Sequence, residues 1–276
     1  MFFAGIDIGS TMTKVVVLDD DEHILASIIG PTGVEHRHLA LKVMDDALQE
    51  AKLTMEDIDF IVATGYGRIN VPFADKQITE ITCHARGISS LFPGARIIID
   101  IGGQDSKGIK LDTGGKVSNF IMNDKCAAGT GRFLEVISEA LGIKLDQMGQ
   151  ISLTAEKYVK ISNTCTVFAE HEVTSRLAEG ASIPEIVAGL HESIAGRIVN
   201  MVRHLGIERD VIVTGGGAKN IGLVRAIEDK VGFPVMVPQE PFLTGAIGAA
   251  LVGHDFVRRG IRQEHERKRE KVTFFQ

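Results

Sequence analysis

Apolar residues occur along the chain in two patterns: short runs rich in Ile and Val, and longer segments in which apolar positions recur every three or four residues. The first pattern is typical of buried strands and the second of amphipathic helices, so their alternation predicts an α/β protein. The run GIDIGSTMTKVVVLD at residues 5–19 joins two such strands through an Asp and a glycine turn. The run IIIDIGGQDSKGIKLD at residues 97–112 repeats this arrangement. The repetition predicts a duplicated fold.

The predicted elements divide between two lobes. Strands are predicted at residues 4–9, 13–18, 24–30, 59–65, 97–102, 107–112 and 116–121, and in the runs DVIVT and FPVMVP. Helices are predicted at residues 36–52, 78–90, 166–179, 184–205 and 219–231, after CAAGTG, and in LTGAIGAALVGHDFV. The chain breaks at Pro93-Gly94, which indicates a boundary there. We therefore expect residues 1–93 and 243–262 in lobe I, residues 94–242 in lobe II, and a charged tail at residues 263–276.

Composition narrows the classes of function. The chain has 276 residues, of which 44% are hydrophobic, and a net charge of -6. The acidic balance argues against nucleic acid as the main partner, and no apolar run reaches the roughly 18 residues of a membrane span. The N-terminus has no basic region before its apolar residues, so we do not expect a signal peptide. Three cysteines are too few for a disulfide framework, which favours a reducing, cytoplasmic setting.

Three glycine turns carry the candidate chemistry. Glycine lets backbone N–H groups approach phosphate oxygens, and an Asp can hold Mg²⁺ through water. The first turn follows Asp7, the second follows Asp100, and the third is the run TGGG at residues 214–217. Their order and spacing resemble the actin-like ATPase superfamily, which includes sugar kinases and chaperone ATPases. The resemblance implies a ribonuclease H-like duplicated fold, with two lobes and the nucleotide in the cleft.

In that superfamily the first two turns hold phosphate and metal, and the third borders adenosine. The resemblance implies that Asp7 holds Mg²⁺ through water and that Asp100 belongs to the second phosphate loop. The other residues expected to bind the nucleotide are Ser10, Thr11, Thr13, Lys14, Gly102, Gly103, Gly215, Gly216, Gly217 and Asn220. Gln104 cannot take a proton, but its amide can orient a water. This favours hydrolysis, although Asp105 is left open as a general base for transfer to a substrate.

Two cysteines have unusual surroundings. Cys126 lies in NDKCAAGTG and Cys165 in SNTCTVFAE, each just before a predicted helix. A thiolate there would lie near the positive end of a helix dipole. The alternative is a pair of small buried apolar residues, for which the small polar neighbours are a poor setting. Two thiolates are half of the four that an iron–sulfur cluster usually takes, and a two-fold dimer would supply the other half.

Longer motifs resemble one family. The runs ATGYGR, ADKQITEITCHARG, IDIGGQDSK, NDKCAAGTGRFLEV and SNTCTVFAE are similar to motifs of the activator components of 2-hydroxyacyl-CoA dehydratases. The same family, of the BadF/BadG/BcrA/BcrD type, includes the ATPase subunits of ATP-dependent benzoyl-CoA reductases. The runs TGGGAKN and LTGAIGAAL fit this family as well.

The resemblance implies a homodimer, or a heterodimer of similar subunits, with one bridging 4Fe-4S cluster held by Cys126 and Cys165 of each subunit. Cys83 is then structural, and Lys125 and Arg132 tune the cluster, dock a partner or are solvated charges. The implied reaction is ATP hydrolysis coupled to transfer of one low-potential electron. The donor is reduced ferredoxin or flavodoxin, and the acceptor is an iron–sulfur dehydratase or reductase. A cluster of this kind implies oxygen sensitivity and an anaerobic metabolism.

Two other functions stay open on the sequence alone. A sugar or acyl kinase of the same fold would phosphorylate a small acceptor, and a regulator of the chaperone type would use nucleotide only as a clamp. Neither of these functions needs a pair of thiolates. The two cysteines are therefore the sequence feature that distinguishes the activator from the kinase and the regulator. The sequence leaves open the partner enzyme, the charged tail, and the roles of Tyr66, Arg68, Glu170 and Glu172.

Overall fold

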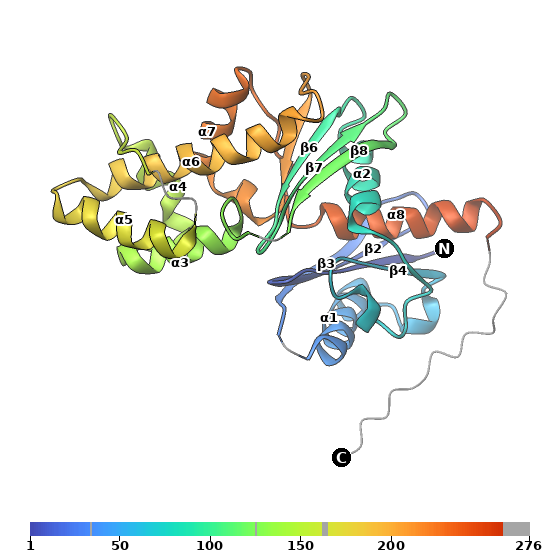
Figure 1. Ribbon diagram of the computed structural model, residues 1–276. Coiled ribbons are helices and arrows are strands. Elements are labelled where there is room, and N and C mark those ends of the chain that lie inside the picture. Colours follow the sequence, from blue (N-terminus) through green and yellow to red (C-terminus); the bar gives the residue numbers. More distant parts are fainter. Residues whose placement is uncertain (34, 125, 162–164, 262–276) are drawn as a thin grey trace, which may run out of the picture. The chain divides into compact units, whose positions relative to one another are not determined.

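The computed structural model describes residues 1–33, 35–124, 126–161 and 165–261. The chain forms two compact units (Figure 1), of which unit 1 comprises Met1–Ser90 and Leu243–Gln276, and unit 2 comprises Leu91–Phe242. The sequence predicted this division after residue 93. The predicted tail at residues 263–276 lies outside the described residues. Within the described ranges, every helix is too short or too polar to span a membrane.

Unit 1 is built on a five-stranded sheet with the strand order β3-β2-β1-β4-β5. Strand β1 pairs antiparallel with β2 on one edge and parallel with β4 on the other. Its hairpin partner and a strand from later in the chain therefore lie on either side of it. The strands are β1 (Phe3–Ile8), β2 (Met12–Leu18), β3 (Ile24–Pro31), β4 (Phe60–Thr64) and β5 (Lys76–Gln77). Two short 3₁₀ turns, η1 (Met55–Asp57) and η2 (Arg68–Asn70), flank β4.

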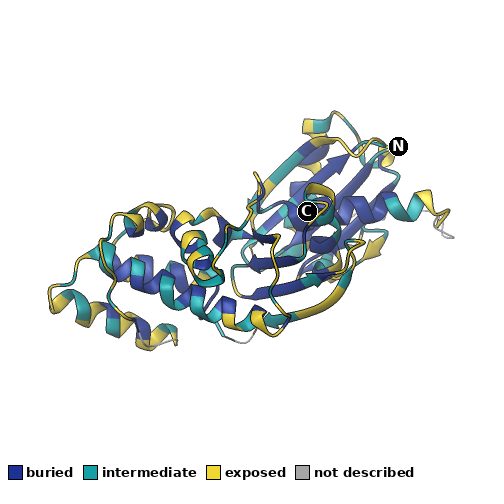
Figure 2. Cartoon of the chain, turned by 90° about the horizontal axis from the view of Figure 1, so that it is seen from above, coloured by how far each residue is buried: buried dark blue, intermediate teal, exposed yellow. Residues whose placement is uncertain are grey.

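Helices cover both faces of this sheet, because alternate strand residues point to opposite sides. Ile6 and Ile8 pack in one cluster with Met44 of α1 (His36–Ala51). Phe3 and Phe60 belong to a second cluster, which includes residues of α2 (Glu80–Leu91) and α8 (Thr244–Arg258). Buried residues therefore line both faces of the central strands (Figure 2).

Unit 2 contains a four-stranded sheet with the order β8-β7-β6-β9 and a helical layer that supplies most of its core. The strands are β6 (Ile97–Ile101), β7 (Ser106–Leu111), β8 (Val117–Asn123) and β9 (Val211–Thr214). The helices are α3 (Gly131–Leu141), α4 (Met148–Leu153), α5 (Thr166–Ala178), α6 (Ile183–Arg203) and α7 (Ile221–Val231), with 3₁₀ turns η3 (Leu145–Gln147) and η4 (Gly216–Lys219).

Two local differences from the predicted elements have clear causes. Helix α7 begins at residue 221 instead of 219, because the side chain of Asn220 accepts a hydrogen bond from the N–H of Leu223 and so caps the helix. The predicted strand FPVMVP is reduced to a single bridge between Ile212 and Met236. Pro234 and Pro238 have no N–H to donate. The N–H of Val235 bonds to the side chain of Glu228, so Met236 provides the backbone bonds of this run to β9.

The two sheets repeat one pattern. Strands β1, β2, β3 and β4 of unit 1 have the same order and directions as β6, β7, β8 and β9 of unit 2. In each unit an antiparallel hairpin leads into a third strand, and a later strand pairs parallel with the first. The structure therefore confirms the duplication that the two hairpin sequences predicted.

Glycine allows very close backbone packing between α8 and its neighbours in unit 1. A Cβ atom at Gly248 would lie 1.7 Å from the carbonyl oxygen of Cys83 on α2. A Cβ at Gly5 of β1 would lie 2.0 Å from the carbonyl oxygen of Ala246 on α8. Backbone atoms cannot move aside as a flexible side chain can, so these contacts require glycine.

We predict that Gly248→Ala lowers the free energy of unfolding by at least about 2 kcal/mol, because the added methyl forces α2 and α8 apart. Gly196→Ala is the matched control, since it also lies inside a helix but its Cβ would meet only Lys230 Cε at 4.0 Å. That change should be neutral or should stabilise by up to about 1 kcal/mol. Urea unfolding of both variants measures the difference, and equal stabilities would contradict the packing argument.

Candidate functional site

The first glycine turn in unit 1 places a carboxylate and an ammonium group side by side. Asp7, 5% exposed, lies opposite Lys14 in the register of β1 and β2, and Lys14 Nζ donates to Asp7 Oδ2 at 3.1 Å. The N–H of Gly9 bonds to the carbonyl of Met12 and closes the turn. Thr13 is buried, with its Oγ1 2.9 Å from Thr32 Oγ1.

The turn also presents two hydroxyl side chains at the surface of unit 1. Ser10 and Thr11 are partly exposed, in contrast to the buried Thr13. The structure therefore brings together the residues predicted for the first phosphate loop. Thr13 differs from the other two because its hydroxyl already has a partner in Thr32.

The second turn, in unit 2, repeats this arrangement with an additional carboxylate. Asp100, 3% exposed, lies opposite Lys107 in the register of β6 and β7. Lys107 Nζ is 3.0 Å from Asp100 Oδ2 and 2.7 Å from Asp105 Oδ2. The N–H of Gly102 bonds to the carbonyl of Asp105, as that of Gly9 does to Met12 in unit 1.

Lys107 was not among the residues predicted for the site. A signal for it was present in the sequence, because Lys107 follows Asp100 by the same seven positions that separate Lys14 from Asp7. The ion pair of Asp105 with Lys107 also bears on the general base that the sequence left open. The carboxylate oxygen that faces Lys107 is engaged by the ammonium group.

A glycine with positive φ lies against the key carboxylate in each unit. Gly65, at φ +83°, follows β4, and a Cβ there would lie 2.4 Å from Asp7 Oδ1. Gly215, at φ +78°, follows β9, and a Cβ there would lie 2.5 Å from Asp100 Oδ1. The run ATGYGR of unit 1 is therefore the counterpart of VTGGGAKN in unit 2, which the sequence analysis did not recognise. In that run Tyr66 is 60% exposed and Arg68 donates to the carbonyl of Gly65.

The second turn is also bonded to the beginning of α3. The N–H groups of Gly131 and Arg132 donate to the carbonyls of Gly102 and Gly103, at 2.8 and 2.7 Å. The first N–H groups of a helix have no partner within the helix, and these two are satisfied by the turn. Gln104, next in the turn, has an exposed side chain.

The third turn forms one end of unit 2. The N–H of Gly215 bonds to the carbonyl of Pro241, and a Cβ at Gly216 would lie 3.0 Å from the ring of Phe242. Lys219 Nζ is 3.0 Å from Glu240 Oε2 and lies over the Phe242 ring, 5.5 Å from its centroid. Gly217 is buried against Ile101 of β6, so the turn is held close to the sheet.

Asn220 ends this turn and is held by a buried histidine. Its Nδ2 is 2.9 Å from Nε2 of His191 on α6, and His191 Nδ1 is 3.0 Å from Oγ of Ser152 on α4. An amide NH₂ only donates, so His191 Nε2 accepts and its proton resides on Nδ1. Ser152 Oγ accepts a hydrogen bond from this N–H and donates its own hydrogen to the carbonyl of Gly149. Burial lowers the pKa of His191 to about 4, so the ring is neutral at pH 7.

The three cysteines lie in different environments. Cys83 is fully buried on α2, and burial raises the pKa of its thiol to about 12. Cys126 is partly exposed in the loop between β8 and α3, and Arg197 Nη2 of α6 donates to its Sγ at 3.9 Å. Cys165 is exposed and is the N-cap residue of α5.

The expected position of both thiols at helix N-termini holds for only one of them. Cys165 immediately precedes α5, whereas Cys126 lies before a turn that ends at Thr130, the N-cap of α3. The first N–H groups of α3 point to the second turn instead. Cys126 has Arg197 as its positive neighbour, and the amide of Asn123 fixes its loop by donating to the carbonyl of Cys126 at 2.9 Å.

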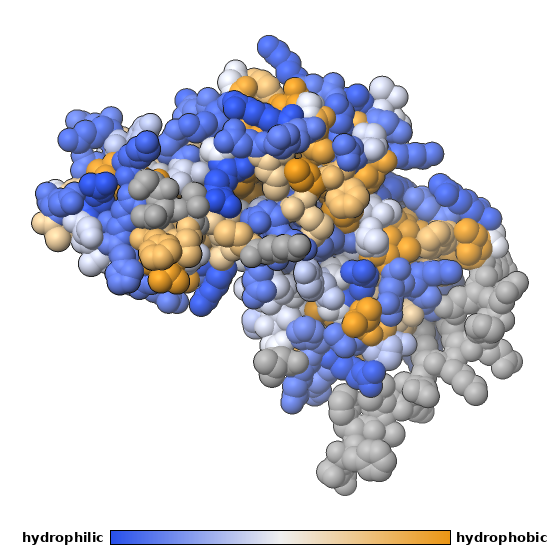
Figure 3. All heavy atoms as spheres, viewed as in Figure 1, coloured by the Kyte–Doolittle hydropathy of each residue, from blue (hydrophilic) through white to orange (hydrophobic). Residues whose placement is uncertain are grey.

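Two other charged residues of these helices, Arg132 and Glu172, have ion-pair partners on their own helix. Arg132 is exposed and pairs with Glu135, and Glu172 pairs with Arg176 on α5. Glu170 is exposed, and Lys125 lies outside the described residues. Beside Cys165, the side chains of Val167 and Phe168 are each 61% exposed. Figure 3 shows apolar side chains on the surface of this part of unit 2.

The donor set of unit 2 fits half of an iron–sulfur site. Two accessible thiols lie on loops next to helices, and the apolar side chains beside Cys165 could exclude water from a bound group. A cluster held by thiolates alone takes four cysteines. In such a site the described residues of one chain would supply two ligands, and a second chain would have to supply the others.

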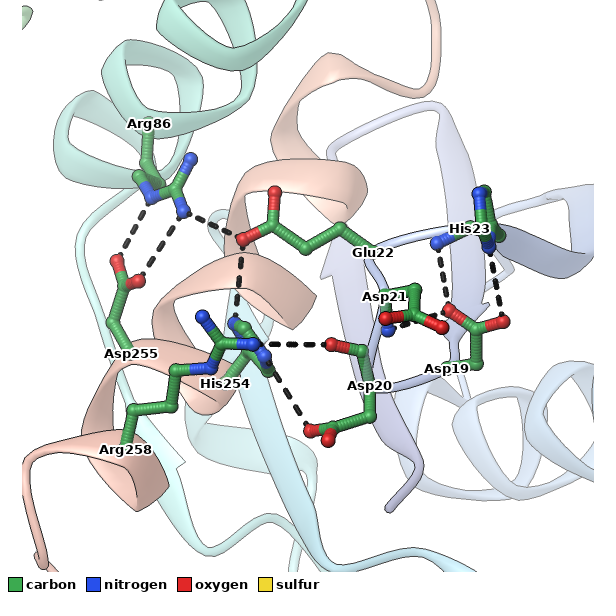
Figure 4. Close-up of polar contacts among 9 residues, drawn as sticks. All are labelled: Asp19, Asp20, Asp21, Glu22, His23, Arg86, His254, Asp255 and Arg258. Atoms are coloured by element: carbon green, nitrogen blue, oxygen red, sulfur yellow. Dashed lines mark hydrogen bonds and ion pairs between the residues drawn. The ribbon is translucent and has the colours of Figure 1, made fainter.

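A polar cluster elsewhere in unit 1 has ligand-like spacing but is an ion-pair network (Figure 4). Arg86 donates to Asp255 through Nε at 2.8 Å and through Nη2 at 3.2 Å, and also to Glu22 at 3.4 Å. The buried ring of His254 lies between Glu22 and Asp20, at 3.3 and 3.6 Å. A cation held by Glu22, His254 and Asp255 would have to displace the guanidinium of Arg86. The ion pairs join the β2–β3 turn to α2 and α8.

Comparison with known proteins gives a consistent result over almost the whole chain. A family model described as the BadF/BadG/BcrA/BcrD ATPase family matches residues 4–253. The 2-hydroxyisocaproyl-CoA dehydratase activator of Clostridioides difficile is 48% identical over 257 residues, which cover 92% of this chain and 96% of that protein. A benzoyl-CoA reductase subunit from Thauera aromatica is 34% identical over 261 residues, which cover 91% of this chain and 92% of that protein.

Solved structures agree with this match. The activator of the 2-hydroxyisocaproyl-CoA dehydratase from Clostridium difficile with bound ADPNP is 46% identical, with a TM-score of 0.89 over 95% of this chain and 97% of that one. A ROK family glucokinase from Streptomyces griseus is 14% identical, with a TM-score of 0.57 over 92% of this chain and 100% of that one, and shares the fold alone. These likenesses confirm the predicted α/β, actin-like ATPase fold.

We predict that Lys107→Met lowers the free energy of unfolding by about 3 to 5 kcal/mol, because it leaves two buried carboxylates without their cation. Lys14→Met should cost less, since Lys14 pairs with Asp7 at a side chain that is 12% exposed, against 3% for Lys107. Urea unfolding of both variants at pH 7 is the measurement. A smaller loss in Lys107→Met than in Lys14→Met would contradict the role of the double ion pair.

We predict that His191 makes stability fall in acid. Its pKa is about 4 in the fold against an ordinary 6.5, so between these values the unfolded chain takes up a proton that the fold excludes. The contribution is complete above pH 6.5 and is lost as the pH falls, by about 3 kcal/mol at most. His191→Gln should therefore show a flatter loss of stability from pH 6.5 to 4 in urea titrations. An unchanged slope would rule out this protonation.

Proposed function

Because this chain belongs to the BadF/BadG/BcrA/BcrD ATPase family, we propose that it is the ATP-hydrolysing activator of a 2-hydroxyacyl-CoA dehydratase. The observation that carries the proposal is the combination, in one chain, of two Asp-Lys glycine turns and two accessible cysteines on loops next to helices. The turns suit a nucleotide with its metal, and the thiols suit an iron–sulfur group. A kinase needs only the first of these.

The first two turns bind phosphate and Mg²⁺ in this proposal. Asp7 holds the metal through water, and Lys14 and the partly exposed hydroxyls of Ser10 and Thr11 meet phosphate oxygens. Thr13 supports the turn through its bond to Thr32. Lys14 lies within hydrogen-bond reach of Asp7 and is placed to exchange a carboxylate contact for a phosphate contact.

The second turn performs the hydrolytic role. Gln104 has an exposed amide that can orient the attacking water, while Asp100 stays paired with Lys107. The engagement of Asp105 by the same lysine supports hydrolysis over transfer to an acceptor hydroxyl, which needs a free base. Gly215, Gly216, Gly217 and Asn220 border adenosine, where the loop approaches Phe242.

Cys126 and Cys165 hold one 4Fe-4S cluster together with the same pair from a second subunit. A bound cluster would supply storage and release of one electron at low potential. Reduced ferredoxin or flavodoxin is the proposed donor, and the iron–sulfur dehydratase is the acceptor. The second subunit is proposed to be an identical copy, since the 48% identity to a dehydratase activator exceeds the 34% identity to a benzoyl-CoA reductase component.

We predict about four irons per two chains in protein purified without oxygen. Cys126→Ser and Cys165→Ser should each lose most of this iron, because each removes two of the four ligands of a dimer. Cys83→Ala is the matched control and should keep it, since Cys83 is buried on α2 of unit 1. All three variants should still bind ADP, which calorimetry measures. Iron that is absent from reconstituted wild-type protein would exclude the activator role.

A further inference from the structure

One helix of unit 2 contacts both the third glycine turn and a candidate cluster cysteine. His191 of α6 accepts from Asn220, the last residue of that turn, and Arg197 of the same helix donates to Cys126 Sγ. The two side chains are six positions apart, which is about 9 Å along the axis at 1.5 Å per residue. A contact with each feature from one helix provides a direct mechanical path between them.

Helix α6 is well suited to move as a rigid element. It has 21 residues, and its first turn is closed by a capping box in which Ser182 and Glu185 bond to each other's backbone N–H groups. Its apolar side, including Leu190, Ile194 and Ile198, is buried in the core of unit 2. A helix held along its length in this way transmits a displacement at one end to the rest of its residues.

The contact at the nucleotide end is specific. Each polar atom of the His191 ring has one partner, and the donor and acceptor roles of Asn220, His191 and Ser152 are all determined. Asn220 also caps α7, so any movement of the turn acts on α6 and α7 together. An ion pair between Glu192 of α6 and Lys230 of α7 ties the two helices a second time.

The contact at the cysteine end concerns charge. The guanidinium group of Arg197 places a positive charge and an N–H donor 3.9 Å from the sulfur of Cys126. The sulfur of Cys126 meets this group while its backbone carbonyl is fixed by Asn123. A shift of α6 would therefore move this positive charge relative to the sulfur, whereas the hydrogen bond from Asn123 to the carbonyl of Cys126 does not involve α6.

We propose that α6 couples nucleotide binding to the environment of Cys126, through His191 at the glycine turn and Arg197 at the sulfur. The proposal rests on the proposed function in one respect, namely that the third turn borders the nucleotide. By thermodynamic linkage the effect is reciprocal: whatever factor ADP imposes on the state of Cys126, that state imposes on the affinity for ADP. His191 and Arg197 are positioning residues in this scheme.

A second path is present in the structure and has to be separated from this one. The second turn is bonded to the N-terminus of α3, which follows the Cys126 loop. Replacing Arg197 leaves those bonds intact, and so does replacing His191. Substitutions of these two α6 residues therefore test the proposed path without disturbing the contacts of α3.

The test measures how fast iodoacetamide alkylates Cys126 in the full-length chain, by mass spectrometry, with and without saturating ADP. The protein is used as purified without oxygen and again after iron chelation. Cys165 in the same digest gives an internal reference, and Cys83 reports unfolding. We expect ADP to change the rate at Cys126 about fivefold in the wild-type chain, the lower end of usual coupling between sites. Alkylated Cys126 should in turn change the dissociation constant for ADP, by a factor that calorimetry measures on its own, because linkage relates equilibria and not rates.

Arg197→Gln should abolish the effect of ADP on Cys126 while leaving the affinity of the unmodified protein for ADP within about twofold of wild type. His191→Leu should abolish it as well, and His191→Gln, whose amide oxygen can accept from Asn220, should restore most of it. Arg203→Gln is the matched control on the same helix, because exposed Arg203 donates to Asn200 of its own helix and should leave the effect unchanged. Arg197→Gln keeps the test valid if His191→Leu does not fold.

Two outcomes would overturn the proposal. One is an ADP effect that persists in Arg197→Gln and His191→Leu, which would assign the coupling to α3. The other is a wild-type chain that binds ADP with no change at Cys126. The proposed function is tested independently, by measuring iron content and ATP hydrolysis on the same preparations. A chain without iron whose Cys126 still responds to ADP would exclude the activator role and retain the α6 link.

Discussion

In both units the structure depends on a charged pair that is buried at the end of the central strand. Asp7 with Lys14, and Asp100 with Lys107, sit opposite each other in hairpin register, and a glycine with positive φ packs closely against each carboxylate. A carboxylate can be buried only when a cation or hydrogen bonds compensate its charge. The backbone is therefore shaped around the pair, and the glycine turns take their positions from it.

The same pair explains how a stable fold can offer a binding site for charged phosphates. Each lysine neutralises its aspartate before any ligand is present, so the site does not have to bury an isolated charge. In unit 2 the lysine also pairs with a second carboxylate, Asp105, and the first turn of unit 1 has no such residue. The two copies of one motif have thus diverged, with partly exposed hydroxyls and one ion pair in the first turn and an exposed amide with a double ion pair in the second. The two turns therefore offer different chemical groups to a ligand.

Unit 2 adds polar contacts that connect the turns to the cysteines. The N-terminus of α3 is satisfied by Gly102 and Gly103, and α6 reaches both Asn220 and Cys126. These contacts use groups that would otherwise be unpaired on burial, namely helix N–H groups and the ring of His191. Connections of this kind persist because breaking either one leaves a buried polar atom unsatisfied. They also give small movements at the turns a route to Cys126.

The sequence by itself determined most of the elements, the duplication and the family. Strand runs such as IIIDI and the helix of residues 184–205 follow from local periodicity, and long motifs such as NDKCAAGTGRFLEV are specific without any geometry. Only the tertiary structure decided which residues meet. Strand register places Lys107 opposite Asp100, and Gly65 lies against Asp7. The packing of α6 brings His191 to Asn220 and Arg197 to Cys126. The start of α7 at residue 221 likewise depended on the Asn220 cap, and the loss of the FPVMVP strand on the bond from Val235 to the side chain of Glu228. The physical reason is that periodicity records which side of an element is buried, whereas a hydrogen bond or ion pair depends on what another part of the chain places opposite it.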